Sequence, residues 1–410
     1  MEHKELRFQR LLSNDEVTNG EPVYLFNADR FVRNFVDLQT EFRKIYPNTR
    51  IAYSYKTNHI PGICKLVDTL GGYAEVVSST EADLAYYMTA RNTGRVIFNG
   101  LIPGKYMADI LKFDGKVNVE SWEGLKCVLE NAEKQVKIGI RIGEEDSRFG
   151  FLESELFKVL SKITEAKQTV AGIHCHVGGS RSLQTWKKKT ERMLRIARDV
   201  ENILGYPLEY IDLGGHLFGR MDEELKKQFG DDIPTFREYA ETVATLVRDT
   251  YEKRKSMPQL ILEPGTALIA DAVSILATVQ NVKIRGMKRV ATLDVSSHDC
   301  GMIADYKNLT VENISTPDLK SDIPTVICGY TCMEEDYINR EYMGWLKTGD
   351  RVLIHNCGAY SMSMKGNFIF PMLAMYMVND NYEIQEIMRE RGQLSDITAR
   401  CAIGGRRCAT

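Results

Sequence analysis

The sequence lacks the features that mark several large classes of protein. Its nine cysteines are scattered without a CxxC pair or a regular spacing, which argues against a disulfide framework or a zinc site and favours a reducing compartment. No apolar run is long enough to cross a bilayer, and the first residues, MEHKELRFQRLL, lack the apolar core of a signal peptide. We therefore expect a cytoplasmic protein without a metal site and without a membrane partner.

An excess of charge of one sign is also missing. The 53 Lys and Arg residues nearly balance the 56 Asp and Glu residues, which leaves a formal net charge of -3. One basic run stands out, Lys187-Lys188-Lys189, and we interpret it as the solvated face of a helix. Because phosphate-backbone binding needs a basic surface, we do not expect nucleic acid as a partner.

What the sequence does contain is typical of a folded enzyme of more than one domain. Hydrophobic residues make up 43% of the chain and charged residues 27%, so there is enough apolar material to build a core. A length of 410 residues exceeds what one small core holds, and two domains are the natural expectation.

One plan repeats between about residue 50 and residue 265: a short β-rich run, a turn, and a longer amphipathic stretch. Eight such units most simply close into a (β/α)8 barrel, an α/β fold in which the chemistry lies at the C-terminal ends of the strands. The expected strands are residues 51–56, 73–78, 95–100, 116–121, 136–143, 170–178, 208–215 and 259–265.

Polar residues and glycines fall at the ends of these expected strands. Any one of them is explained by a turn or a solvated loop, but their coincidence on six strands predicts one shared site at the barrel mouth. They are Lys56, Glu75, Arg141, His176, the pair Gly214-Gly215, and the run Glu263-Pro264-Gly265.

After about residue 270 the pattern changes to alternating runs such as VSILATVQNVKI (273–284) and DRVLIHNCGAY (350–360), which predict an antiparallel sheet. PVYLFN (22–27) is also strand-like and precedes the first expected helix. We therefore expect residues 29–270 to form the barrel, and residues 1–28 with 271–410 to form a β-sandwich-like domain.

Motifs in a fixed order from about residue 22 to residue 370 carry a family resemblance. They resemble those of the group that includes diaminopimelate, ornithine and arginine decarboxylases, enzymes with an alanine-racemase-type barrel that use pyridoxal 5'-phosphate (PLP). The segments are AYSYKTN (52–58), EVVSSTEADLA (75–85), RIGEEDSRFG (141–150), HCHVGGS (174–180), DLGGHLFG (212–219), LEPGTALIA (262–270), GYTCMEEDYI (329–338) and GAYSMS (358–363).

The resemblance implies roles for individual residues. Lys56 would bind PLP covalently, and Glu263 would face the pyridine nitrogen, where a carboxylate keeps the ring protonated. His176 would stack on the ring, although His174 points to the same side of its strand. The implied catalytic residues are Lys56, Cys332, His176 and Glu263. The implied cofactor-binding residues are Lys56, Glu75, Arg141, His176, Ser180, Gly214, Gly215, His216, Glu263, Gly265, Thr266 and Tyr360, with Glu81 also placed near the cofactor.

Three departures from the family pattern fall where the phosphate would bind. His216 replaces the third glycine of the D-x-G-G-G motif, and Thr266 replaces the arginine of E-P-G-R, which removes a permanent charge. Ser180 stands one place later than the serine of H-x-G-S. Backbone N–H groups of Gly214, Gly215 and Gly265 remain available for the phosphate.

Two other departures concern the substrate. The arginine segment with which diaminopimelate decarboxylases hold a distal carboxylate corresponds here to HDCGMIADYKN (298–308), which has no arginine. Their acidic residue after the cysteine is here Met333. A distal ammonium has other candidate partners, which are Asp305, Glu334, Glu335 and Asp336.

The leading hypothesis is a PLP-dependent carboxy-lyase that acts on a basic amino acid such as lysine or ornithine, or on a conjugated intermediate of siderophore or antibiotic synthesis. The alternatives are a diaminopimelate decarboxylase, a racemase, for which Cys332 stands where a catalytic tyrosine is needed, and a non-catalytic binding protein of the same fold. The resemblance also implies a homodimer with shared sites, Lys56 coming from one chain and Cys332 from the other.

Overall fold

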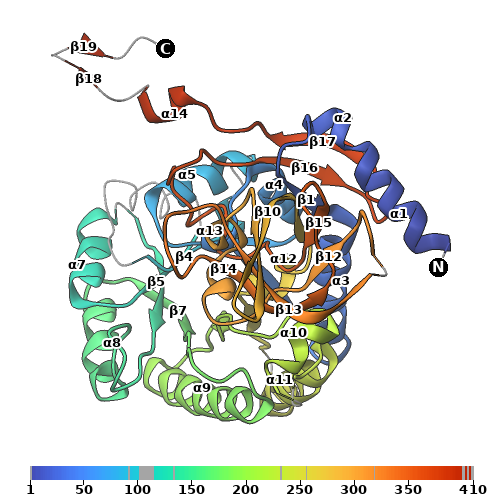
Figure 1. The fold of residues 1–410 in the computed structure, drawn as a ribbon. Helices are drawn as coiled ribbons and strands as arrows, with labels where there is room; N and C mark the ends of the chain where they lie inside the picture. Colours follow the sequence, from blue (N-terminus) through green and yellow to red (C-terminus); the bar gives the residue numbers. More distant parts are fainter. Residues whose placement is uncertain are drawn as a thin grey trace. The chain divides into compact units, whose positions relative to one another are not determined.

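The computed structural model describes residues 2–90, 93–100, 115–132, 134–230, 233–254, 256–317, 319–398, 402–403 and 406–407. The chain divides into two compact units (Figure 1). The first, here the barrel unit, comprises Asn34–Gly219 and Asp232–Ala267. The second, here the β unit, comprises Met1–Arg33, Arg220–Asp231 and Leu268–Thr410.

Eight parallel strands close the barrel in sequence order, each paired with the next and the last with the first. Each of the eight expected strands is therefore confirmed, and so is the fold class. The strands are β2 (Thr49–Ser54), β3 (Tyr73–Val76), β4 (Val96–Phe98), β5 (Lys116–Val119), β6 (Lys137–Arg141), β7 (Thr169–His174), β8 (Tyr210–Asp212) and β9 (Gln259–Leu262).

Helices surround the barrel strands (Figure 1). Several of them begin at a serine cap. The hydroxyls of Ser78, Ser121 and Ser182 accept N–H bonds from the first turns of α5, α7 and α9, each worth about 1 kcal/mol. The elements are α3 (Ala28–Ile45), η1 (Tyr55–Thr57), α4 (Pro61–Thr69), α5 (Ser79–Met88), η2 (Thr93–Arg95), α7 (Trp122–Asn131), η3 (Glu153–Glu155), α8 (Leu156–Glu165), α9 (Leu183–Leu204), α11 (Phe236–Tyr251) and α12 (Thr266–Ile269).

Tyr210 of β8 fills the interior of the barrel. It packs with Ala52, Ile97 and Ile261, and a Cβ on Gly172 of β7 would lie only 2.5 Å from its ring. Glycine at that position makes room for the aromatic side chain. The barrel is thus a packed core, and its chemistry is confined to the strand ends.

The β unit is built on a nine-stranded sheet in which antiparallel pairings predominate. The N-terminal strand β1 joins it, as expected, antiparallel to β10 but parallel to β16. A second parallel pair joins β11 to β13, and the chain between them passes through α13, η4 and β12, a strand that pairs with β15.

The strands of the β unit are β1 (Val23–Asn27), β10 (Val273–Arg285), β11 (Lys288–Leu293), β12 (Val311–Asn313), β13 (Lys320–Cys328), β14 (Tyr337–Gly344), β15 (Arg351–Ile354), β16 (Ala374–Val378) and β17 (Ile384–Arg389), with the separate pair β18 (Ala402–Ile403) and β19 (Arg406–Arg407). Its helices are α1 (Glu2–Ser13), α2 (Asp15–Thr18), α10 (Glu223–Lys227), α13 (Ser297–Cys300), η4 (Met302–Asp305) and α14 (Leu394–Thr398).

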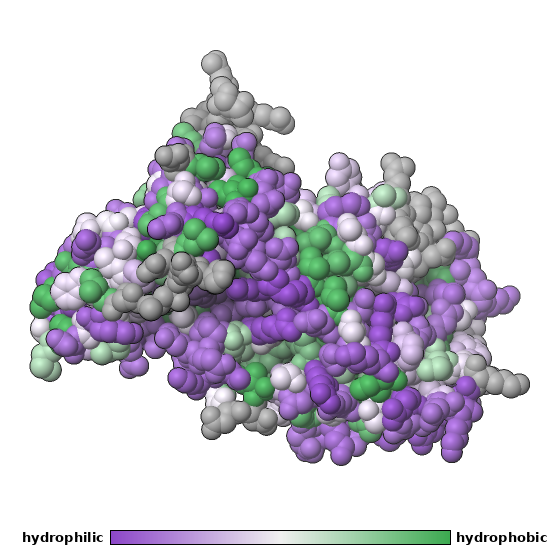
Figure 2. Space-filling view, turned by 90° about the vertical axis from the view of Figure 1, so that its right-hand side faces the viewer, coloured by the Kyte–Doolittle hydropathy of each residue, from purple (hydrophilic) through white to green (hydrophobic). Residues whose placement is uncertain are grey.

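Hydrophilic side chains cover most of the face shown in Figure 2, and hydrophobic groups form small patches between them. Among the described helices, none combines the length and the apolar composition that crossing a membrane requires.

Candidate active site at the barrel mouth

A cavity of about 650 Å³ opens at the C-terminal ends of the barrel strands. That volume suits a small-molecule ligand. Five of the residues expected at the site line it, namely Lys56, Glu75, Arg141, His176 and Glu263; its other lining residues are Val77, Ser78, Ser79, Asn99, Gly100, Arg148, Phe149 and His174.

Lys56 follows β2 in the short helix η1, and its ammonium pairs with a buried carboxylate. Nζ lies 2.6 Å from Oε2 of Glu75, which is only 1% exposed, and Ser54 donates a hydrogen bond to the same oxygen. The second acid of this motif, Glu81, instead accepts the N–H of Val77 at 2.8 Å beside the start of α5. Glu75 is thus the acid of the motif that contacts the lysine, and Glu81 is a helix-capping residue.

Glu263 is an ionised carboxylate enclosed by the barrel. Its Oε1 accepts a hydrogen bond from Asn99 at 2.6 Å, and its Oε2 lies 3.3 Å from Nε2 of His174. Burial by itself favours the neutral acid, but the adjacent His174 outweighs it and holds the pKa of Glu263 well below its usual range. The cavity therefore contains a fixed negative charge.

Asp212, at the end of β8, is the second acid of this buried cluster. One oxygen or ring nitrogen from each of His174, Asp212 and Glu263 lies within 4.8 Å of the others. Burial and the neighbouring Glu263 charge raise the pKa of Asp212 well above its usual range. Because two adjacent buried carboxyls do not both ionise, Asp212 carries the proton and Glu263 the charge.

Asn99 links the two carboxylates of the site, and sequence reasoning missed it. Its Nδ2 donates to Glu263 at 2.6 Å and to Glu75 at 3.2 Å, while its Oδ1 accepts from Asn118 at 2.8 Å. Tyr210 in turn donates to Asn118 at 2.7 Å. The signal was present, because Asn99 directly follows β4 just as the expected site residues follow their strands.

Arg141 is held in place by a partner that was also missed. Glu120, the residue after β5, is 3.1 Å from the guanidinium, and the ring of Phe149 lies 4.5 Å from it. The guanidinium of Arg148 lies 4.2 Å from the centre of the same ring. The cavity therefore presents two arginines around one aromatic ring.

His174, the last residue of β7, and His176, two residues further on, lie at different depths. His174 is 1% exposed and contacts Glu263, whereas His176 is open to the cavity. Nδ1 of His176 accepts the N–H of Gly215 at 3.3 Å, and desolvation inside the barrel mouth lowers its pKa. The His176 ring is thus neutral and has the accessible aromatic face.

The glycines expected to bind phosphate lie in tightly packed loops after β8 and β9. A Cβ would lie 2.4 Å from the Cys175 carbonyl at Gly214, 2.3 Å from the Glu263 carbonyl at Gly215 and 2.0 Å from Thr57 at Gly265. No larger residue fits these positions. Glycine at these positions lets the backbone of both loops approach its neighbours this closely.

The three residues that replace the family's phosphate ligands lie in these or adjoining loops. His216 adopts a left-handed backbone conformation, with φ at 74°, and its Nε2 lies 2.7 Å from the Gly179 carbonyl. Ser180 accepts the N–H of Ser182 at 3.2 Å, and Thr266 is the first residue of α12.

Tyr360 and Asp305, expected at the cofactor and the substrate, belong to the β unit. They line one cavity of about 300 Å³ together with Met302, Met333 and other residues. Cys332 is exposed on the loop between β13 and β14, unlike the buried Cys300 and Cys357 of the same unit.

The acidic run after Cys332 separates into two kinds of residue. Glu334 and Glu335 are exposed and do not line the cavity of Asp305. Asp336 is 4% exposed, and its carboxylate accepts hydrogen bonds from the N–H of Ser297 at 2.7 Å and the hydroxyl of Thr331 at 2.6 Å. Its contacts are those of a residue that stabilises the loop.

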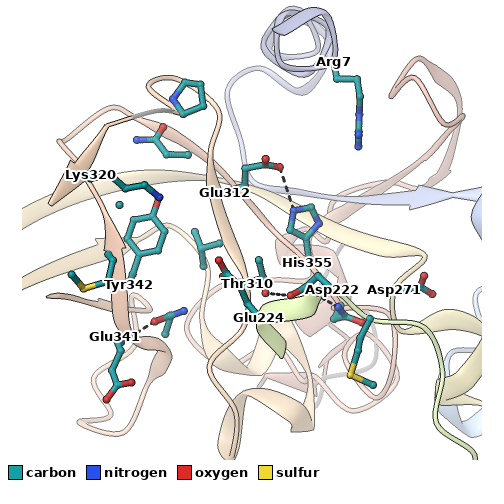
Figure 3. A pocket seen from close by; sticks show the side chains of 18 of the residues that line it. Arg7, Asp222, Glu224, Asp271, Thr310, Glu312, Lys320, Glu341, Tyr342 and His355 are labelled. Atoms are coloured by element: carbon teal, nitrogen blue, oxygen red, sulfur yellow. Dashed lines mark hydrogen bonds and ion pairs between the residues drawn. The ribbon is translucent and has the colours of Figure 1, made fainter. Parts of the chain in front are cut away.

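A larger cavity, of about 730 Å³, lies within the β unit (Figure 3). Two of its acidic groups are engaged with neighbours: Glu312 lies 3.5 Å from His355, and Asp222 accepts hydrogen bonds from Thr310 and Asn356. None of the residues expected at the site line it. The candidate active site is therefore the smaller cavity at the barrel mouth.

The groups at the barrel mouth fit PLP. Lys56 supplies an amine in the same cavity as the charge of Glu263, which matches a protonated pyridine nitrogen, and His176 offers a neutral aromatic face. Because the glycines of the loops after β8 and β9 have no Cβ, a ligand can approach their backbone closely.

Comparison with known proteins agrees with this chemistry. The family described as "Pyridoxal-dependent decarboxylase, pyridoxal binding domain" matches residues 32–270. The chain is 24% identical to a diaminopimelate decarboxylase of Aquifex aeolicus, over 91% of this chain and 90% of that protein. It is 26% identical to the diaminopimelate decarboxylase of Methanothermobacter thermautotrophicus, over 92% and 91% of the two chains.

Solved structures share the fold. The diaminopimelate decarboxylase of M. jannaschii in complex with L-lysine superposes with a TM-score of 0.84 at 23% identity, covering 95% of this chain and 94% of that one. The lysine/ornithine decarboxylase of Vibrio vulnificus in complex with putrescine gives 0.76 at 17% identity, covering 92% and 98%.

Proposed function

The chain belongs to the family of pyridoxal-dependent decarboxylases, and from this premise we propose that it removes the α-carboxylate of a basic or conjugated amino acid as carbon dioxide. The observation that carries the proposal is the enclosed, ionised Glu263 in the same cavity as the amine of Lys56. An ionised acid at that position is what a pyridine electron acceptor requires.

When bound, PLP supplies an electron-accepting ring for the electron pair that remains after carbon dioxide leaves. Lys56 would hold the cofactor covalently, and Glu263 would hold the proton on the pyridine nitrogen. Asn99 fixes the Glu263 and Glu75 carboxylates relative to each other, and His176 would cover one face of the ring. These residues bind and orient, so the protein's own part in the chemistry is mainly electrostatic preorganisation.

Two classes of substrate fit the proposed reaction. A basic or conjugated amino acid is favoured by the missing arginine in residues 298–308 and by Met333 after Cys332. Diaminopimelate is the second candidate, because relatives that match about nine-tenths of this chain carry that name. Asp305 would contact a distal ammonium in either case, and Asp336 would instead stabilise its loop.

Carbon-dioxide release across a substrate panel tests the proposal. The panel comprises meso-diaminopimelate, both enantiomers of lysine, ornithine and arginine, and citryl conjugates. We expect release from at least one of them, and an Asp305→Asn enzyme should show a raised KM for a substrate with a distal amine far more than for one without it. A protein that binds PLP yet releases carbon dioxide from none of these would contradict the proposal.

We also propose that the active form is a homodimer in which Cys332 of one chain serves the site of the other. The exposure of Cys332 supports this, since a buried core cysteine is the commoner fate of the residue. A thiol there would return a proton to the carbon that has lost its carboxylate.

Complementation tests the shared site. Mixed Lys56→Ala and Cys332→Ala chains, allowed to exchange, form half heterodimers with one intact site each, so roughly a quarter of wild-type activity should return. If exchange is demonstrated and no activity returns, the two groups do not serve a shared site.

A further inference from the structure

The last lysine of the Lys187-Lys188-Lys189 run contradicts the interpretation of that run as a solvated helix face. Lys187 and Lys188 are exposed on α9, as expected, but Lys189 is only 7% exposed. Its position explains this, because Lys189 is three residues after the buried Trp186 and therefore lies on the same inward face of the helix.

Lys189 is a buried ammonium without a close counter-ion. Its Nζ donates to the Leu213 carbonyl at 2.8 Å and lies 3.2 Å from the centre of the Trp186 ring. Within the described ranges of the chain, no carboxylate oxygen lies within 4 Å of it. Burial lowers the pKa of Lys189 to about 8, so most of the side chain is still charged at neutral pH.

The nearby acids, Asp212 and Glu263, raise the pKa of Lys189 through space but only partly offset the effect of burial. Burial and the neighbouring Glu263 raise the pKa of Asp212, which favours its neutral form, and Glu263 is hydrogen-bonded by Asn99 and adjacent to His174. A buried, uncompensated ammonium is strongly destabilising, and an apolar residue of similar size is the more stable choice. Among the described residues no acid pairs directly with this lysine, and a bound anion would complete its charge balance.

The contacts of Lys189 place it behind the loop that follows β8. The ammonium holds the carbonyl of Leu213, which directly precedes Gly214, and Trp186 donates its indole N–H to the His216 carbonyl at 3.3 Å. One face of α9 thus fixes both ends of the segment Gly214–His216. Within this segment the N–H of Gly214 donates to Oδ1 of Asp212 at 2.9 Å, and the N–H of Gly215 donates to Nδ1 of His176 at 3.3 Å. The N–H of His216 is the donor of the segment that these bonds leave for a phosphate.

We propose that Lys189 is the positioning residue for the cofactor phosphate: it orients the loop after β8 and supplies, from behind it, the cationic charge that Thr266 does not provide. The inference rests on the proposed function, because it takes the ligand of this loop to be the phosphate of PLP. The charge at the phosphate and the geometry of the loop both depend on this one buried side chain.

Apoprotein titrations with PLP and with pyridoxal, which lacks the phosphate, test the inference. Wild type should prefer PLP strongly. Lys189→Met should weaken PLP binding by roughly tenfold or more and leave pyridoxal binding within about twofold. Lys188→Met, an exposed neighbour on the same helix, should change neither constant, and Lys189→Arg should retain much of the preference.

Thermal denaturation gives a second reading that is independent of catalysis. Lys189→Met should raise the Tm of the apoprotein, because an uncompensated charge is removed, and reduce the Tm gain on adding PLP. Equal losses of PLP and pyridoxal affinity would show a purely structural role, and an unchanged PLP affinity would also overturn the inference. A wild-type protein that binds neither compound would instead refute the proposed function itself.

Discussion

The two halves of the barrel mouth, which we propose bind the ring and the phosphate of PLP, are built in different ways. On the ring half, side chains from separate strands form one network, in which Lys56, Glu75, Asn99 and Glu263 are joined by direct hydrogen bonds. On the other half, where we propose that the phosphate binds, the main feature is backbone: glycine loops with no room for a Cβ, and the carbonyl of Leu213 bonded to the ammonium of Lys189.

The difference shows which positions can change without loss of the site. A charge that faces a reacting atom must be placed by a specific side chain, and the ring half keeps the residues that the family resemblance predicts. A phosphate is bound largely by N–H groups, which every residue except proline supplies. On this proposal, His216 and Thr266 can stand where the family pattern has a glycine and an arginine.

The largest effect is expected from the loss of Lys56, at the centre of the ring half. Lys56→Ala removes the amine that holds the cofactor, and turnover should fall by roughly three orders of magnitude or more. Steady-state carbon-dioxide release measures this, and reductive trapping with borohydride should no longer label the peptide that contains residue 56. Lys65→Ala, at an exposed lysine of α4, is the matched control. Activity near that of the control would refute the assignment of Lys56.

Glu263→Gln separates the effect of the ring half on kcat from the effect of the phosphate half on PLP affinity. The amide keeps the shape but not the charge, so kcat should fall by roughly a hundredfold while PLP affinity changes much less, because the phosphate half is intact. Stopped-flow turnover and cofactor titration measure the two quantities. Glu241→Gln on the exposed face of α11 should alter neither. An unchanged kcat would mean that another group protonates the ring.

Asn99 tests whether the ring half acts as a network. Asn99→Ala removes the donor shared by Glu75 and Glu263 and should lower kcat by roughly tenfold. Asn99→Asp should cost more than alanine, because it adds a third carboxylate and cannot donate while ionised. Asn131→Ala in α7 is the control. If both Asn99 variants matched wild type, the network would be structural only.

The smallest effect is expected from a substitution at Thr266, which tests the phosphate half. Thr266→Arg adds a guanidinium beside the glycine loops and should tighten PLP binding by roughly threefold, with kcat unchanged at saturating cofactor. Titration of the apoprotein measures it, with Thr266→Ala as the companion variant. Tighter binding by the alanine variant would show that Thr266 hinders the phosphate.

Much of the fold follows from local pattern. The period of two residues in strands and of 3.6 residues in helices is visible in any window of the chain, so the eight barrel strands were predictable. The same rule, applied to polar residues at strand ends, placed Lys56 and Glu263 correctly in one cavity. Applied more fully, it would also have indicated Asn99 and Glu120.

The sequence by itself determined the strands, the order of the motifs and the side chains available to the cavity. Only the tertiary structure decided which of them interact: that Asn99 joins two carboxylates, that Asp336 stabilises a loop, and that Lys189 is buried. Helical spacing puts Lys189 on the inward face, but its charge argues for solvent. The Leu213 carbonyl, 24 residues away in the chain, decides between them, because a buried polar group needs a partner that only the closed barrel brings within reach.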